Sequence, residues 1–85
     1  MKGQKRNYRE ELALFAAVLK SGNPHGDNNS RVFSKLIFVA CVAKSEKVQF
    51  GRFYNDIASL VGRGSLEWNR KIGGKWARNA WGASE

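Results

Sequence analysis

The chain has 85 residues, of which 15 are Lys or Arg and 7 are Asp or Glu, so its formal net charge is +8. This length allows one small domain, and a hydrophobic content of 42% is enough for one core, which argues against intrinsic disorder. A core this small leaves little room for a catalytic cleft, so we expect a binding protein and not an enzyme. Such a basic excess is typical of proteins that bind nucleic acid, although a solvated basic surface is the alternative.

Cysteine content and apolar runs give further expectations. Cys41 is the only cysteine, so no intrachain disulfide can form, and we expect it to be a small buried hydrophobe. His25 has no second ligand nearby, so we expect neither a metal nor a cofactor. The apolar run 12–19 is short and follows Glu10 and Glu11, which predicts no signal peptide, no membrane partner and a cytoplasmic protein.

The N-terminal third is predicted to contain a basic tail over residues 1–6, a helix over 7–21 and a polar loop over 22–30. The helix is indicated by apolar residues at helical spacing, which are Leu12, Phe15, Ala16 and Leu19. Asn7 is the expected N-cap, with Glu10 three residues later. We expect Glu10 and Glu11 to face water.

A strongly apolar helix is predicted over 31–45, with Ser30 as its N-cap. Its apolar residues lie on more than one face, so we expect it to be the central, most buried helix. The alternating pattern over 48–50 predicts a short extended piece. A third helix is predicted over 52–61, and Gly62 should end it.

A fourth helix is predicted over 66–80, which gives a mainly α fold of about four helices in a single domain, 1–85. Residues 53–80 have the outline of a helix-turn-helix, for which a winged-helix-like form is one alternative. The small residues Ala58 and Gly62 would allow the two helices to approach and turn sharply.

Positive charge concentrates in this segment, because residues 62–80 contain five cationic residues and one acidic residue, a net charge of +4. On a helix, three of the cations share one stripe: Lys71, Lys75 and Arg78. An apolar stripe lies beside it: Trp68, Ile72 and Trp76. We expect the apolar stripe to pack on the core and the cations to face the phosphates of DNA.

The candidate site residues divide by role. Those expected to contact phosphates are Arg63, Lys71, Lys75 and Arg78. Those expected to approach bases are Ser65, Asn69 and Arg70, and Ser65 is also the expected N-cap of the fourth helix. Gly73 and Gly74 either allow close approach to a DNA backbone or mark a break between two shorter helices.

The tryptophans raise a second alternative, in which exposed indoles stack on single-stranded DNA or on RNA. We expect Trp76 to belong to the core, because a small domain needs large apolar residues there. Trp81 lies close to the chain end and is the tryptophan that we expect to be exposed.

Residues 54–79 carry a resemblance to a known family. The stretches Tyr54-Asn-Asp-Ile-Ala-Ser-Leu-Val-Gly62 and Arg70-Lys-Ile-Gly-Gly-Lys-Trp-Ala-Arg-Asn79 resemble the DNA-binding half of the DNA alkyltransferase and alkyltransferase-like family. The resemblance implies a winged-helix-like element docked in the minor groove. Tyr54 would then lie near a phosphate and Arg70 in the base stack, while Gly73 and Gly74 would allow close approach.

The family's active-site segment, Pro-Cys-His-Arg, has no counterpart after residue 79, and Cys41 lies upstream. The resemblance therefore implies DNA contact without alkyl transfer. A second function class stays open: a small phage- or plasmid-type inhibitor or accessory subunit that docks on a larger nucleoprotein or acidic protein. Its expected mark is an exposed apolar patch that includes Trp68 and Trp81.

Overall fold

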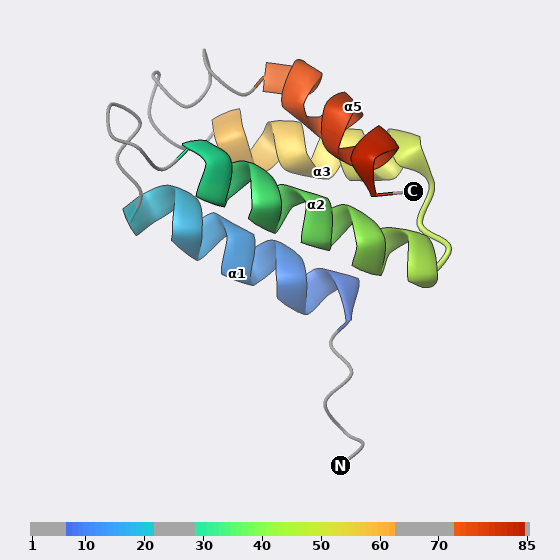
Figure 1. Cartoon of the computed structure of the whole chain (residues 1–85). Coiled ribbons are helices and arrows are strands. Elements are labelled where there is room, and N and C mark those ends of the chain that lie inside the picture. The colour runs from blue at the N-terminus through green and yellow to red at the C-terminus, as the bar shows by residue number, and fades with distance from the viewer. Residues whose placement is uncertain (1–6, 22–28, 63–72, 85) are drawn as a thin grey trace.

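The computed structural model describes residues 7–21, 29–62 and 73–84 of the chain. These residues form four helices and no strand (Figure 1): α1 (Tyr8–Ser21), α2 (Asn29–Ser45), α3 (Phe50–Gly62) and α5 (Gly73–Ala83). The predicted mainly α fold is therefore confirmed. The predicted tail over 1–6, most of the predicted loop over 22–30, and the predicted turn between the last two helices lie outside the described residues.

Each of the two central helices, α2 and α3, contacts both of the outer helices, α1 and α5. Figure 1 shows α1 and α5 on opposite sides of the molecule, with α2 and α3 between them. The face that α1 shares with α2 is therefore separate from the face that α5 shares with α3.

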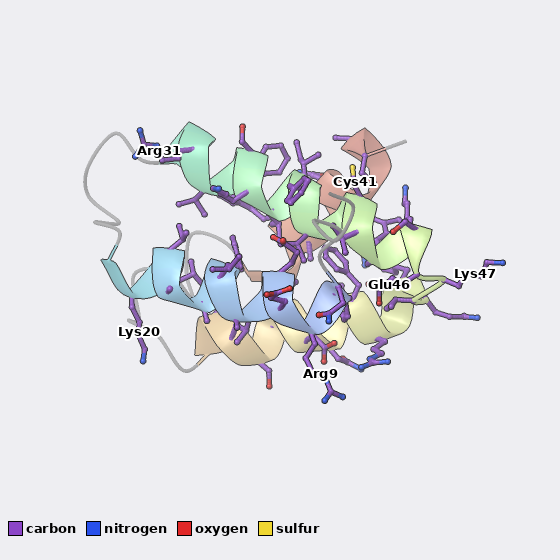
Figure 2. All side chains as sticks on the ribbon, turned by 90° about the horizontal axis from the view of Figure 1, so that it is seen from below. Arg9, Lys20, Arg31, Cys41, Glu46 and Lys47 are labelled. Atoms are coloured by element: carbon purple, nitrogen blue, oxygen red, sulfur yellow. The ribbon has the colours of Figure 1, made fainter. Side chains whose placement is uncertain are left out.

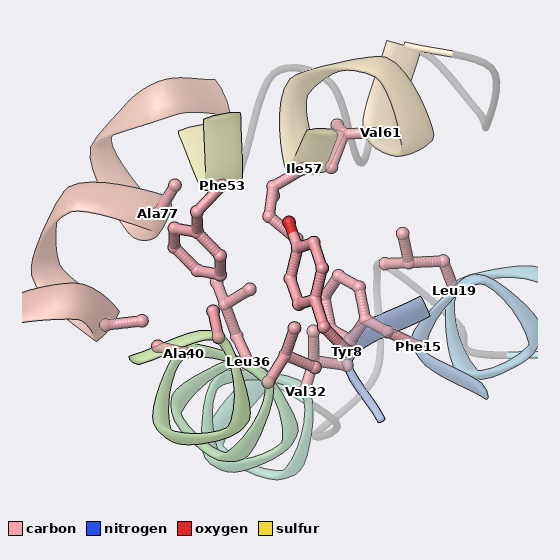
Figure 3. Packing of buried hydrophobic residues seen from close by; sticks show 13 residues of the cluster. Tyr8, Phe15, Leu19, Val32, Leu36, Ala40, Phe53, Ile57, Val61 and Ala77 are labelled. Atoms are coloured by element: carbon pink, nitrogen blue, oxygen red, sulfur yellow. The ribbon is translucent and has the colours of Figure 1, made fainter. Parts of the chain in front are cut away.

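The core lies where the four helices meet, and Figure 3 shows its side chains converging. Its buried apolar members are Tyr8, Phe15, Leu19, Val32, Leu36, Val39, Ala40, Ala43, Phe53, Ile57, Val61, Ala77 and Ala80. α2 supplies five of them, more than any other helix, as its apolar pattern predicted. One prediction for α2 is wrong, because Cys41 is exposed. Cys41 lies at the edge of the contact with α5, where its Sγ is 3.9 Å from the Ser84 carbonyl oxygen just after that helix.

The N-terminus of α1 is capped from two directions. Asn7 is the N-cap as predicted, since its Oδ1 accepts the Glu10 N–H at 2.7 Å. The Glu46 carboxylate, just after α2, accepts the Tyr8 N–H at 2.9 Å. Two N–H groups that the helix itself leaves unpaired are thus satisfied, and the start of α1 is held beside the end of α2. The expectation that Glu11 faces water is wrong, because it is only 4% exposed and lies among residues of α1 and α2.

The end of α2 forms a Schellman motif, in which the Val48 N–H bonds to the Ala43 carbonyl at 2.9 Å and the Lys47 N–H to the Lys44 carbonyl at 3.0 Å. Lys47 takes the left-handed conformation that this motif requires, with φ at 63°. The chain then turns directly into α3 at Phe50. The predicted extended piece over 48–50 is therefore wrong at its last residue, and α3 begins two residues earlier than predicted.

The other helix ends differ little from the sequence predictions, except at α5. α2 begins at Asn29, so Ser30 lies in its first turn and the prediction that it is the N-cap is wrong. α3 ends at Gly62 as predicted. α5 begins at Gly73 and continues to Ala83, so the two glycines open this helix and do not lie in its middle. Within the described ranges, no helix combines the length and the apolar character needed to cross a membrane.

Candidate nucleic-acid interface

Two of the predicted site residues meet where α3 packs against α5. The Arg78 guanidinium lies over the Tyr54 ring, with its central carbon 6.0 Å from the ring centroid. The Tyr54 ring is half-buried and also meets Phe50 edge-on, at 5.7 Å between centroids. A tyrosine and an arginine from different helices thus share one surface, which we call the α3/α5 surface and define by Tyr54, Lys75 and Arg78.

The α3/α5 surface is cationic. Lys75 and Arg78 are exposed and lie three residues apart, so they project from one side of α5. α5 carries no acidic residue between Gly73 and Ala83. The only acidic residue of α3, Asp56, lies on the other side of that helix, toward α1. The two cations therefore have no carboxylate beside them in the described part of α5.

Four apolar residues of α5, two small and two large, determine which side of this helix faces the core. Ala77 and Ala80 are completely buried, and their small side chains let α5 approach the core closely. Trp76 meets Phe33 of α2 edge-on at 5.5 Å, so the prediction that it packs on the core is confirmed. The expectation that Trp81 is exposed is wrong, because its ring packs against Phe53 at 5.0 Å. With both indoles turned inward, the charged side of α5 faces outward.

Trp81 is also held by the end of α2. Lys44 Nζ donates to the Trp81 carbonyl at 2.7 Å and lies 4.9 Å from the centroid of its ring. A cation at a helix C-terminus stabilises the unpaired carbonyls and the negative end of the helix dipole. The Ser84 hydroxyl donates to the same carbonyl at 2.8 Å. The last turn of α5 is therefore fixed to α2.

Asp56, the acidic residue of α3, is bound by side chains of α1 and of its own helix. The Tyr8 hydroxyl donates to Asp56 Oδ2 at 2.8 Å, and Arg52 Nε lies 3.6 Å from the same oxygen. Burial of Tyr8, together with its bond to the Asp56 carboxylate, raises the pKa of the Tyr8 phenol above its ordinary value. Arg52 also lies over the Tyr8 ring, 5.6 Å from its centroid. These groups connect α1 to α3 and keep the Asp56 carboxylate away from the α3/α5 surface.

The structure describes only part of the predicted site. It brings Tyr54 and Arg78 together, places Lys75 three residues before Arg78 on α5, and puts Gly73 and Gly74 at the start of the same helix. The other predicted residues lie outside the described ranges: Arg63, Ser65, Asn69, Arg70 and Lys71. Trp68 lies there too, so the turn of the helix-turn-helix and its base-contacting residues stay predictions.

Sequence reasoning missed two exposed apolar side chains on the opposite side of the molecule. Leu14 of α1 is 43% exposed and Phe38 of α2 is 49% exposed. In the sequence both are apolar residues within apolar helices. Periodicity alone does not distinguish them from the buried residues of the same helices. They form a second surface feature that does not involve α5.

Neither a metal-ligand cluster nor a similar protein identifies a further functional site. Within the residues that the structure describes, no three His, Cys, Asp or Glu side chains come together to hold a metal ion. Comparisons with protein-family models, curated proteins and solved structures found no match to the chain. The α3/α5 surface, with its geometry and charge, is therefore the candidate functional site.

Proposed function

We propose that this protein binds nucleic acid, with duplex DNA as the preferred form, and that it does so without catalysis. The observation that carries the proposal is the α3/α5 surface, where exposed Arg78 lies over the Tyr54 ring and exposed Lys75 precedes it by three residues on α5, with no described carboxylate among them. Cations in this arrangement neutralise phosphates and release the counterions that surround DNA, which supplies most of the affinity. The net charge of +8 adds long-range attraction to any polyanion.

The proposed roles follow from placement on the two helices. Lys75 and Arg78 contact phosphates, and the ring of Tyr54 holds the Arg78 guanidinium in an extended position at the surface. The packing of α3 against α5 supports the predicted helix-turn-helix, because that motif requires these two segments to be neighbours. In this proposal Arg70 reads bases, with Asn69 and Ser65, while Arg63 and Lys71 add phosphate contacts.

The proposal is tested by fluorescence anisotropy of labelled duplex and single-stranded oligonucleotides, titrated with the protein at two salt concentrations. If about six cations engage phosphates, the duplex affinity should fall about 10³-fold between about 50 and 200 mM salt. Tighter binding to single strands than to duplex would favour stacking or RNA recognition. No binding to any oligonucleotide at low salt would contradict the proposal and favour the inhibitor or accessory-subunit alternative.

Matched variants separate a defined surface from nonspecific attraction. Lys75→Gln and Arg78→Gln should each weaken binding to all sequences equally and reduce the salt slope by about one. Lys20→Gln is the control, because Lys20 is an exposed cation in the last turn of α1, on the other side of the molecule. Arg70→Ala should weaken binding to preferred sites more than to others. Equal losses for Lys20→Gln and Lys75→Gln would contradict the assignment to the α3/α5 surface.

A further inference from the structure

A groove runs between α1 and α2 on the side of the molecule away from α5. It has a volume of about 340 Å³ and is lined by six apolar residues together with the buried Glu11 and with Lys35. Leu14, Val18 and Phe38 are among its lining residues, and Leu14 and Phe38 are 43% and 49% exposed. Large apolar side chains that lie exposed together on a small protein mark an interaction surface, because they are stabilised when another apolar surface covers them.

Charge is distributed unequally along this groove. The start of α1 lies beside the end of α2, so the two helices run antiparallel (Figure 1). Glu11 lines the groove, and Glu10 lies beside it in the first turn of α1, one turn before Leu14, so this end is acidic. Lys35 lines the groove, and Arg31 lies one turn before Lys35, so the other end is basic. Figure 2 shows Arg31 at the opposite end of the helix pair from Glu46, the residue that caps α1.

We propose that this groove is an interface with a second copy of the chain, related by a two-fold axis perpendicular to α1 and α2. With an axis in this direction, the groove of the second copy runs in the opposite direction to that of the first. The acidic end of each copy therefore meets the basic end of the other. Glu10 then lies opposite Arg31 of the partner subunit and Lys35 of the partner subunit. The two Phe38 rings lie near the axis, where each one covers the apolar groove of the other copy.

The charge pattern favours a second copy as the occupant. An interface between identical chains must be complementary to itself, and a groove with an apolar centre, one acidic end and one basic end meets this condition. A uniformly basic rim would instead cause two copies to repel. The proposed dimer does not depend on nucleic-acid binding, and it leaves Lys75 and Arg78 on the far side of each copy.

The test is sedimentation equilibrium of the full chain without nucleic acid, from about 1 µM to about 1 mM, the range in which a weak interface dissociates and forms. The proposal predicts a mass that rises from 9.5 kDa toward twice that value. Phe38→Asp should weaken the dimer at least about tenfold, because it places a charge at the apolar centre. Ala58→Asp is the control and should leave the dimer intact, because Ala58 is exposed on α3 and does not lie buried against a neighbouring helix as the sequence predicts.

Charge reversal tests the two-fold arrangement itself. Glu10→Lys should weaken the dimer about tenfold, since it places like charges together at both ends. The double variant with Glu10→Lys and Lys35→Glu should recover most of that loss, because each new pair is again opposite in sign. Far-UV circular dichroism confirms that every variant is folded.

Three results would overturn the proposal. The first is a mass of 9.5 kDa over the whole concentration range, which would leave the groove to a different protein. The second is equal weakening by Phe38→Asp and Ala58→Asp, since the interface would then lie elsewhere. The third is a double charge variant that dimerises no better than the Glu10→Lys single variant.

Discussion

Replacing Tyr8 by Phe tests how α1 is held to α3. The Tyr8 side chain is 3% exposed, and its hydroxyl donates to Asp56 Oδ2 at 2.8 Å. Tyr8→Phe keeps the buried ring and removes only this bond. A hydrogen bond to a charged group contributes about 1.5–3 kcal/mol, but the Asp56 side chain is 33% exposed and can be rehydrated. We therefore expect a loss of about 1–1.5 kcal/mol in the free energy of unfolding.

Thermal unfolding followed by far-UV circular dichroism measures this loss. For a domain of this size, about 1 kcal/mol lowers Tm by about 4–8 °C, so Tyr8→Phe should lower Tm by about 5–10 °C at neutral pH. Tyr54→Phe is the matched control, because the Tyr54 hydroxyl has no hydrogen bond to any described residue. It should leave Tm almost unchanged. Equal Tm values for Tyr8→Phe and the native protein would refute the reasoning.

The same variant has a characteristic pH dependence. Burial and the bond to Asp56 raise the pKa of Tyr8 in the folded state above its ordinary value of 10.0. The folded state thus holds the phenolic proton more tightly, so this contribution to stability is complete below pH 10 and is lost as the pH rises further. The native protein and Tyr54→Phe should lose more stability above that pH than Tyr8→Phe does. Identical alkaline slopes for all three proteins would contradict the proposed cause.

Three other changes test the core and the helix ends, each by the change in the free energy of unfolding in urea. Phe53→Ala should cost about 3–5 kcal/mol, because the ring is completely buried against Trp81, and a cost below about 1 kcal/mol would contradict this packing. Asn7→Ala should cost about 1 kcal/mol and Asn7→Gly much less, so equal costs would argue against the N-cap. Lys47→Gly should stabilise by about 0.5–1 kcal/mol, because glycine adopts the positive φ without strain, and destabilisation would argue against the Schellman motif.

The helices were predictable because their apolar spacing and end signals are local. The cap at Asn7 and the end of α3 at Gly62 depend on residues within one turn, and both were predicted correctly. Which face of an apolar helix meets which neighbour is a tertiary property. α2 is apolar on several faces and is covered by α1 on one side and α5 on another, so Cys41 and Phe38 remain exposed. Periodicity cannot distinguish these residues from their buried neighbours.

The candidate site was predictable in composition more than in geometry. The charge density of the C-terminal third identified Lys75 and Arg78, and both are exposed. The contact between Arg78 and Tyr54 joins two helices, and it depends on which side of α5 faces α3. This orientation of α5 is set by the buried Ala77 and Ala80 and by the packing of Trp81. A position near the end of the sequence suggested an exposed Trp81, but the close approach of α5 brings its ring to the core.

The central claim, that the α3/α5 surface binds DNA, is tested most directly by NMR. The measurement is a titration of the isotope-labelled protein with a short duplex, following the amide resonances of every assigned residue. The account predicts large shifts at Tyr54, Lys75 and Arg78, and at the proposed contact residues of the segment 63–71, with Leu14 and Phe38 unchanged across the titration. Absence of shifts in α3 and α5, or shifts confined to the groove between α1 and α2, would contradict the proposed interface.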